Sequence, residues 1–461
     1  MGELNPLGQV EDPAEPGKPV QRITAWHVGT VAMLAVGYSG YYFCRSNFSV
    51  ALPLILAEQV RDGMDAHSAQ VGLGSIASIG VLAYALGKVP AGALADRFGG
   101  TKNFLGGMAG SVLFTLLFIA GGGFPIFTLA WFGNRFAQSL GWAGLVKVTS
   151  RWFSYTTYGS VMGILSLSYL FGDAISRQIM SVLLANGMGW RGLFVTGAAL
   201  LGVLFLVNLF FLRESPEAYN LPPAEENPLN LFAHSETRER EQPAEHPPIK
   251  TSAIFLRFFR SRAFLLICFL SLGTTLLRET FNLWMPMYFT QAVGMTSAQA
   301  ASGSAIFPLF GGLSVLVAGF LSDLLGPSGR SRILFGGLAL SVAALAALAF
   351  TPLKAPQMVP LALVALVAFL LIGPYSYLAG AMSLDFGGKD AGATASGIID
   401  AVGYLGGILS GNTMAWVAVT HGWKAFYLVL ALVAALSSVV AAAMLALERR
   451  SVMEKLRLRR T

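Results

Sequence analysis

Long apolar stretches alternate with short polar ones along most of the 461-residue chain. A helix needs about 20 apolar residues to cross the hydrocarbon core of a bilayer. Charged residues make up only 12% of the chain, against about 25% in soluble domains. The sequence therefore predicts an all-α polytopic membrane protein with twelve membrane-spanning helices, near 27–56, 70–94, 103–122, 125–148, 158–185, 192–212, 262–290, 298–324, 332–352, 358–384, 391–417 and 423–447.

One long polar segment, rich in Pro, Glu and Arg, separates two groups of six spans. We predict the following organisation: a tail at 1–26, a six-helix bundle at 27–213, a linker at 214–260, a second six-helix bundle at 261–448 and a basic tail at 449–461. Most basic residues fall in the loops on the same side as both ends of the chain. The positive-inside rule then places both termini in the cytoplasm, and we expect the inner (plasma) membrane as location.

The net charge of +7 does not indicate a nucleic-acid partner, because the basic residues punctuate apolar spans instead of gathering on a soluble face. We expect the lipid bilayer and a small anionic substrate as partners, and a monomer. Cys44 and Cys268 both lie inside apolar segments, and the histidines lack metal-ligand spacing. The sequence contains no Walker A, GxSxG, HExxH or CxxC motif. We therefore expect no metal, no cofactor, no enzymatic activity and no ATP-driven pumping.

The two groups of spans repeat each other. Arg45 and Pro53 of the first recur 233 residues later as Arg278 and Pro286 of the second, and Gly-Trp-Arg at 189–191 corresponds to Gly-Trp-Lys at 422–424 with the same offset. Duplicated halves are the architecture of secondary transporters whose substrate site lies between the repeats near the bilayer midplane. The repeats therefore predict two pseudo-symmetric six-helix bundles with a site between them.

Charged residues inside the spans are the candidates for that site, because each one costs at least about 2.5–3.5 kcal/mol to insert. They are Arg45, Lys88, Arg135, Asp173, Arg177, Arg278, Glu279 and Asp400. Arg45 and Arg278 occupy equivalent positions, so the pseudo-two-fold axis makes them face each other across the central cavity. Guanidinium groups bind phosphate or carboxylate with paired hydrogen bonds. The pair predicts an anion site; the alternative is that each arginine pairs with a helix neighbour such as Glu279.

The other intramembrane residues leave more than one interpretation open. Lys88 either adds a third cation to the cavity or extends toward the cytoplasm. Asp173 and Arg177, spaced i and i+4, are expected to pair. Asp173, Glu279 and Asp400 are candidates for carrying a coupling proton, although Glu279 follows Arg278 and should point about 100 degrees away from it on a helix. Tyr38 and Tyr42 either hydrogen-bond the substrate or pack.

Residues 87–102, GKVPAGALADRFGGTK, resemble the loop signature of the major facilitator superfamily. A looser copy, GFLSD, occupies residues 319–323. The resemblance implies the fold of that superfamily and a conformational latch formed by Gly92, Asp96, Arg97 and Asp323.

Further motifs resemble the organophosphate:phosphate antiporters of this superfamily, which include glycerol-3-phosphate and hexose-phosphate antiporters. These motifs are YYFCRSNF at 41–48, the lysine in YALGKVPAG at 84–92, QSLGW at 138–142, and the arginine at 278. The resemblance implies that Arg45 and Arg278 bind phosphate with Lys88 in support. One departure is Arg135 with Gln138 and Gly141, which resembles the RxxQGxG motif of many proton-coupled carriers.

The favoured hypothesis is alternating-access transport of an organic anion, foremost an organophosphate exchanged for inorganic phosphate. The alternatives are a proton-coupled symporter of an organic anion such as a carboxylate, and a non-transporting sugar-phosphate sensor. A membrane-embedded enzyme lacks a recognisable nucleophile–base pair.

Overall fold

The computed structural model describes residues 23–224, 257–325, 328–352 and 355–458. The first half of the described chain forms α1 (Ala25–Tyr41), α2 (Phe43–Arg61), α3 (Ala66–Phe98), α4 (Gly100–Ala120), α5 (Phe124–Trp152), α6 (Tyr155–Ala185), α7 (Trp190–Phe211) and the short η1 (Pro216–Tyr219). The second half forms α10 (Arg262–Gln291), α11 (Ser297–Ser304), α12 (Ile306–Leu325), α13 (Gly329–Ala349), α14 (Met358–Leu378), α15 (Ala381–Leu409) and α16 (Asn412–Leu458). We call α1–α7 the N-half and α10–α16 the C-half.

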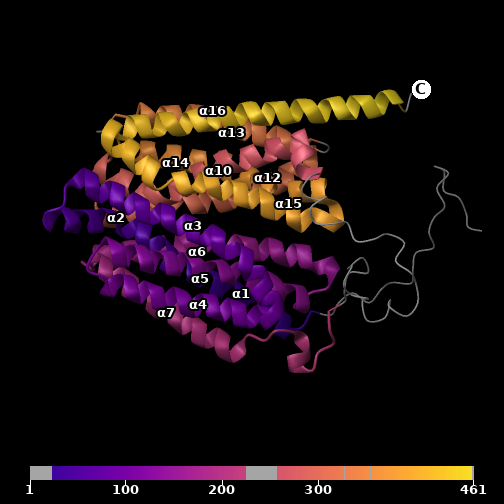
Figure 1. Ribbon diagram of the computed structural model, residues 1–461, viewed down its shortest axis with the longest axis horizontal. Helices are drawn as coiled ribbons and strands as arrows, with labels where there is room; N and C mark the ends of the chain where they lie inside the picture. The colour runs from indigo at the N-terminus through magenta and orange to yellow at the C-terminus, as the bar shows by residue number, and fades with distance from the viewer. Residues whose placement is uncertain (1–22, 225–256, 326–327, 353–354, 459–461) are drawn as a thin grey trace, which may run out of the picture.

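The two halves lie against each other as two layers of helices that run along the long axis of the molecule (Figure 1). The helix α1 begins, and α16 ends, at the same end of the bundle, which we call the terminal face; the opposite end is the far face. The boundaries predicted for the two tails and the linker remain predictions, because residues 1–22, 225–256 and 459–461 lie outside the described part of the chain.

Two of the expected spans are built from two helices each. The span predicted at 27–56 consists of α1 and α2, which are separated at Tyr42, and the span at 298–324 consists of α11 and α12, which are separated at Ala305. The last two spans meet within α16, where Gly422 has a positive φ of 78° that breaks the helix. A positive φ is readily adopted by glycine, so this residue permits the chain to turn back into the membrane.

Eight stretches among the described helices are long and apolar enough to cross a membrane by length and composition alone. The helices α1, α2, α5 and α6 are not among them. Three of these four carry the intramembrane charges Arg45, Arg135, Asp173 and Arg177. Four of the eight candidate charged residues therefore lie on helices that do not meet this criterion.

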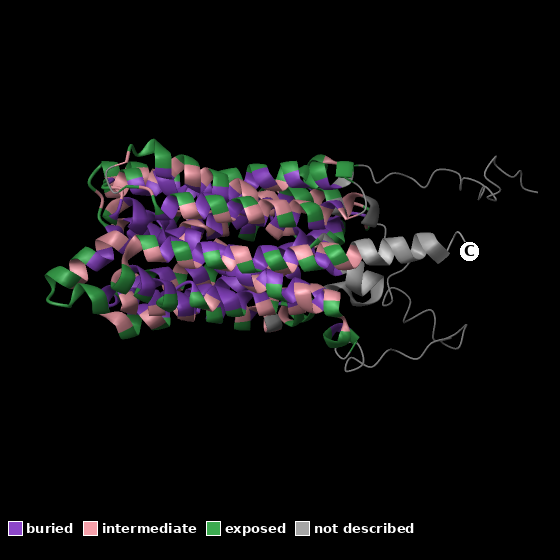
Figure 2. Ribbon diagram, turned by 90° about the horizontal axis from the view of Figure 1, so that it is seen from above, coloured by how far each residue is buried: buried purple, intermediate pink, exposed green. Residues whose placement is uncertain are grey.

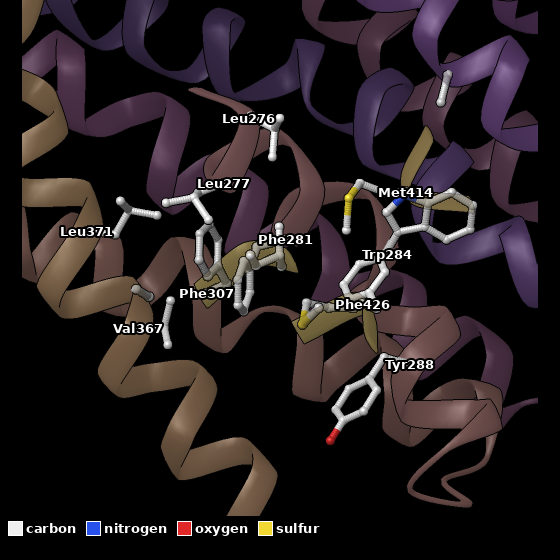
Figure 3. Packing of buried hydrophobic residues seen from close by; sticks show 14 of the residues in the cluster. Leu276, Leu277, Phe281, Trp284, Tyr288, Phe307, Val367, Leu371, Met414 and Phe426 are labelled. Carbon is white, nitrogen blue, oxygen red and sulfur yellow. The ribbon is translucent and has the colours of Figure 1, made fainter. Parts of the chain in front are cut away.

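Apolar side chains fill the space between helices and also face outward. Buried residues lie between the helices and exposed ones lie on the outside (Figure 2), where large side chains such as Phe320 are 72% exposed. Around α10, the rings of Phe281 and Phe307 stack at 5.0 Å, with Trp284 and Phe426 nearby (Figure 3). Exposed aromatic and aliphatic groups suit contact with lipid, whereas the buried rings hold α10 in place beside the central cavity.

The halves are joined by hydrogen bonds at the far face. Ser49 of α2 donates to the carbonyl of Asn282 at 2.8 Å, and Ser181 of α6 donates to the carbonyl of Ala298 at 2.7 Å. The backbones approach so closely there that a Cβ on Gly411 would clash with the carbonyl oxygen of Gly74. Small residues permit this contact between membrane helices.

Ser78 of α3 takes part in this contact in an unusual way. Its hydroxyl accepts a hydrogen bond from the Asn412 amide at 2.8 Å and donates one to the Ile408 carbonyl at 2.6 Å. The amide and the carbonyl are four residues apart, so the hydroxyl occupies the place of one regular helical hydrogen bond. This insertion coincides with the break between α15 and α16.

Candidate functional site

Two cavities lie between the halves. The larger has a volume of about 290 Å³, and residues of both halves line it, from α1, α2, α3, α5 and α6 on one side and from α10, α12, α14 and α15 on the other. The smaller has about 70 Å³ and lies on the far-face side of the first. Tyr42, Arg45, Tyr169 and Arg278 line both cavities, so the two predicted arginines stand at the boundary between them.

Arg45 of α2 is held mainly by aromatic rings. Its guanidinium lies 5.3 Å from the ring centre of Tyr42 and 4.9 Å from that of Tyr84. Its nearest carboxylate contact is Glu279, with Nη2 and Oε1 4.0 Å apart. Aromatic faces attract a cation without occupying its N–H donors. Arg45 therefore keeps donors that an anion in the cavity can use.

Arg278 of α10 is held by a carboxylate. Its Nη2 lies 2.5 Å from Oε1 of Glu279, and its guanidinium lies 4.8 Å from the ring centre of Tyr375. We expected Glu279 to point away from Arg278 because the two residues are adjacent on a helix. Both long side chains instead bend toward each other at the cavity wall. The alternative interpretation, in which Arg278 pairs with Glu279, therefore describes the geometry, and Arg278 lines both cavities as well.

Arg135 of α5 is a third guanidinium close to the same carboxylate and ring. It is 3% exposed, lines the smaller cavity, and lies 4.9 Å from the ring centre of Tyr84. It donates one hydrogen bond, from Nη1 to Oε1 of Gln138 at 3.3 Å. Glu279 lies within 4.0 Å of the guanidinium groups of Arg278 and Arg45, and Arg135 lines the same cavity.

Lys88 and Asp400 form an ion pair across the larger cavity. Lys88 of the N-half and Asp400 of the C-half have Nζ and Oδ2 2.5 Å apart, and their side chains are 28% and 29% exposed. The ammonium of Lys88 lies 4.9 Å from the ring centre of Tyr404. Lys88 therefore faces the cavity and does not extend toward the terminal face, and Asp400 has a partner that sequence reasoning did not identify.

Asp173 and Arg177 contact each other, as their spacing predicts, with Oδ1 and Nε 2.8 Å apart. Both are buried, and Ser46 donates a hydrogen bond to Asp173. Arg177 also donates to the C-half, to Oγ of Ser304 at 3.0 Å and to the carbonyl of Asn282 at 2.9 Å. The pair belongs to the N-half and binds across the closed far face.

Tyrosines form much of the remaining wall. Tyr38 and Tyr42, expected from the sequence, line the larger cavity together with Tyr84 and Tyr404, which sequence reasoning missed. A spacing could have revealed them: Tyr84 precedes Lys88 by four residues, and Tyr404 follows Asp400 by four, which places each on the same helix face as the charge.

The predicted latch residues lie at the terminal face, away from both cavities. Asp96 accepts a hydrogen bond from Lys147 of α5 at 2.6 Å, and Arg97 lies against the ring of Phe98. Gly92 has open space where a Cβ would be. The side chain of Asp323 lies outside the described part of the structure.

Sequence reasoning missed Glu214, which lies in the same region. Its carboxylate accepts hydrogen bonds from the amides of Gly100 at 2.8 Å and Thr101 at 2.7 Å. A carboxylate at a helix N-terminus is stabilising, so Glu214 fixes the start of α4.

Charges around the two cavities do not cancel. The described lining residues include five cations and three carboxylates: Arg45, Lys88, Arg135, Arg177 and Arg278 against Asp173, Glu279 and Asp400. The difference is two positive charges. A space of this kind, with guanidinium donors facing inward, can bind an anion of charge about −2.

Comparison with known proteins places this site in a family. Residues 34–411 match the Major Facilitator Superfamily. The chain therefore belongs to the major facilitator superfamily, as the motif at 87–102 indicated.

Relatives share about a quarter of its sequence over most of its length. The membrane sensor protein UhpC of Salmonella typhimurium is 27% identical and covers 91% of each chain. A probable hexose phosphate transport protein of Chlamydia pneumoniae is 26% identical over 88% of each chain. The glycerol-3-phosphate transporter of Bacillus subtilis is 25% identical over 86% of this chain and 87% of its own. These relatives match the organophosphate:phosphate antiporter resemblance.

Solved structures agree on the fold. A bacterial homologue of the lysosomal transporter Spinster superimposes with a TM-score of 0.69 at 15% identity, covering 94% of this chain and 99% of its own. A D-xylose–proton symporter superimposes with a TM-score of 0.67 at 15% identity, covering 89% and 96%. The predicted fold class is thus confirmed: an all-α polytopic membrane protein with two pseudo-symmetric bundles of six membrane-spanning helices.

Proposed function

We propose that this protein is a secondary active transporter that carries an organophosphate across the membrane in exchange for inorganic phosphate. The observation that carries the proposal is the excess of two positive charges around the cavities. A phosphate monoester carries about −1.5 to −2 charges at pH 7. A bound phosphate or organophosphate therefore offsets the charge of the site almost completely.

The same balance explains why exchange is expected and not net uptake. Uncompensated charge in a region of low dielectric is costly. The empty protein must reorient with two excess charges between its halves, whereas the loaded protein reorients nearly neutral. Reorientation should therefore be slow when the site is empty and fast when an anion fills it, in both directions.

Proton-coupled symport is the main rival within transport. It needs a carboxylate that is free to take up a proton, and Asp173, Glu279 and Asp400 are the candidates. Each of these three contacts a cation: Arg177, Arg278 and Lys88 respectively. These contacts favour exchange over symport.

The lack of a recognisable nucleophile–base pair in the sequence fits a transporter better than an enzyme. We propose that the protein lies in the inner (plasma) membrane as a monomer, uses no cofactor and binds no nucleic acid. Both termini are then cytoplasmic, so the terminal face opens to the cytoplasm and the far face is closed. Gly92, Asp96, Arg97 and Asp323 act as the latch, and Tyr38 and Tyr42 contact the substrate beside Arg45.

A sensor is the second candidate function. Two relatives, 27% and 26% identical, are named membrane sensor protein UhpC. A sensor of this kind would use the same cavity to bind an organophosphate without carrying it across the membrane.

Proteoliposomes test these proposals. We expect vesicles loaded with phosphate to take up radiolabelled glycerol 3-phosphate or a hexose phosphate, with carboxylates as comparison substrates, and uptake should persist with a protonophore. Vesicles without internal anion should take up little. Accumulation in empty vesicles only under an inward proton gradient would overturn exchange in favour of symport. Tight binding without flux would identify a sensor.

A further inference from the structure

The smaller cavity contains a buried cation whose contacts are incomplete. Arg135 and Arg177 both line it and are 3% and 2% exposed. Arg177 has Asp173 as counter-ion and two further hydrogen-bond acceptors. Arg135 has one hydrogen bond of 3.3 Å to a neutral amide, and among the described residues no carboxylate lies within 4.0 Å of it.

A buried guanidinium in this situation calls for an anion. Taking such a charge out of water is unfavourable unless the charge is paired and hydrogen-bonded. The ring centre of Tyr84 lies 4.9 Å from the guanidinium groups of both Arg135 and Arg45, so the two groups contact the same ring. Arg278 lines the same cavity. Three guanidinium groups therefore border a space that Glu279 alone neutralises only in part.

Size limits what this space can hold. A cavity needs about 10–15 Å³ of volume open to water centres to admit one water molecule, and a water molecule in the liquid occupies about 30 Å³. The smaller cavity, at about 70 Å³, therefore admits a compact group of a few atoms. A phosphate tetrahedron is of this size, whereas a whole hexose phosphate is not. The larger cavity, at about 290 Å³, has room for a sugar or a polyol.

We propose that the binding site is divided: the smaller cavity seats the phosphoryl group, with Arg135 as its third guanidinium, and the larger cavity takes the organic part. This inference rests on the proposed function, because it assumes a phosphorylated ligand. Arg45, Arg135 and Arg278 then share the phosphoryl oxygens. The hydroxyl groups of the organic part face Tyr38, Tyr404 and the Lys88–Asp400 pair. Inorganic phosphate needs the smaller cavity only.

The test is a binding measurement on purified protein, so it does not depend on flux. We expect R135Q to weaken the binding of inorganic phosphate and of glycerol 3-phosphate by the same factor, at least tenfold, since both place a phosphoryl group beside Arg135. R135K, which keeps the charge but not the forked donors, should lose several-fold. R191Q is the matched control: Arg191 pairs with Glu58 at the far face, outside both cavities, and this variant should bind phosphate like the wild type.

A double variant separates direct contact from bulk charge. If Arg135 only balanced Glu279, R135Q/E279Q would keep the excess of two charges and recover wild-type affinity. We expect no full recovery, because the phosphoryl group still lacks its third guanidinium. Phosphate affinity within twofold of wild type in R135Q would overturn the divided site. If R135Q does not fold, phosphate affinity within twofold of wild type in R135K would overturn it. Full recovery of phosphate affinity in R135Q/E279Q would also overturn it. Failure of the wild type to bind any phosphate compound would instead overturn the proposed function.

Discussion

The two halves contribute opposite charges to the cavities between them. The N-half provides Arg45, Lys88 and Arg135, because its Asp173 is already paired with its own Arg177. The C-half provides Arg278, Glu279 and Asp400, and its carboxylates outnumber its cation. The halves therefore attract each other across an empty site.

This difference makes the C-half a competitor of the substrate. Asp400 contacts Lys88 at 2.5 Å, and Glu279 lies 4.0 Å from Arg45, so both carboxylates occupy or approach N-half cations. An incoming anion must take these cations from the C-half. Affinity then depends on the difference between the substrate's contacts and the C-half's contacts with the same cations. Removing a competing C-half carboxylate should therefore act in the opposite direction from removing a cation.

R278Q should have the largest effect. It removes one cation and also frees Glu279, which can then capture Arg45 from 4.0 Å away. Truncating one partner of a buried charge pair costs about 2–5 kcal/mol, so we expect phosphate affinity to fall about 100-fold or more. Phosphate binding to the purified protein measures this. The double variant R278Q/E279Q should regain about tenfold, and a double variant no better than R278Q would contradict capture of Arg45.

R45K comes next. It keeps the charge of the N-half but loses the forked donors and the stacking on Tyr42 and Tyr84. We expect phosphate affinity to fall about 10- to 100-fold, since charge-assisted hydrogen bonds each contribute about 1.5–3 kcal/mol. Counterflow of phosphate and binding to purified protein should agree. R191K at the far face serves as control, and wild-type uptake of every tested anion by R45K would argue that charge alone suffices.

R177Q tests the Asp173–Arg177 pair, both members of which belong to the N-half. The change removes two hydrogen bonds to the C-half, to Ser304 and Asn282, and so weakens the closed far face. In a cysteine-free background with A77C, whose side chain lines the smaller cavity, labelling by a membrane-impermeant thiol reagent added on the far-face side should become at least tenfold faster, because hydrogen bonds to a charged group contribute about 1.5–3 kcal/mol each. R177K should lie between. Unchanged labelling would show that other contacts close this face.

D400N should have the smallest effect and the opposite sign. The change leaves Lys88 without its carboxylate, so Lys88 becomes available to the substrate. We expect affinity for glycerol 3-phosphate to rise about threefold, in the range of about 0.2–1 kcal/mol for partly exposed ion pairs, whereas inorganic phosphate, which needs the smaller cavity only, should bind as it does to the wild type. K88Q is the matched counterpart and should lower affinity for glycerol 3-phosphate. Weaker glycerol 3-phosphate binding in D400N would mean that Asp400 does not compete with the substrate.

The fold was predictable because membrane insertion imposes a strong pattern of apolar length, and the constant offset of 233 residues between Arg45 and Arg278 identified equivalent positions. Contacts between halves were harder to foresee. The Lys88–Asp400 pair joins residues 312 positions apart, and no local pattern specifies which cation a distant carboxylate will meet. Glu279 was misjudged because helical angle ignores how far a long side chain can bend.

Arg135 shows a different limit. The motif around Arg135 resembles one found in proton-coupled carriers, so the sequence suggested a role in proton coupling. In the structure, Arg135 instead lines the smaller cavity and contacts the Tyr84 ring, which Arg45 also contacts. Neither the cavity nor the ring contact has a signature in the spacing of residues along one helix.

The hydroxyl of Ser78 in α3 takes part in the break between α15 and α16, so the conformation of the chain at that break depends on contact with α3. It stands between the Asn412 amide and the Ile408 carbonyl, which would otherwise bond to each other in a regular helix. If the halves part at the far face, Ser78 withdraws with α3 and these two groups are free to join. The chain from α15 into α16 then gains the bond it lacks and can straighten. The break between α15 and α16 thus depends on contact between the two halves, and backbone hydrogen exchange at Asn412 would report whether the far face is closed.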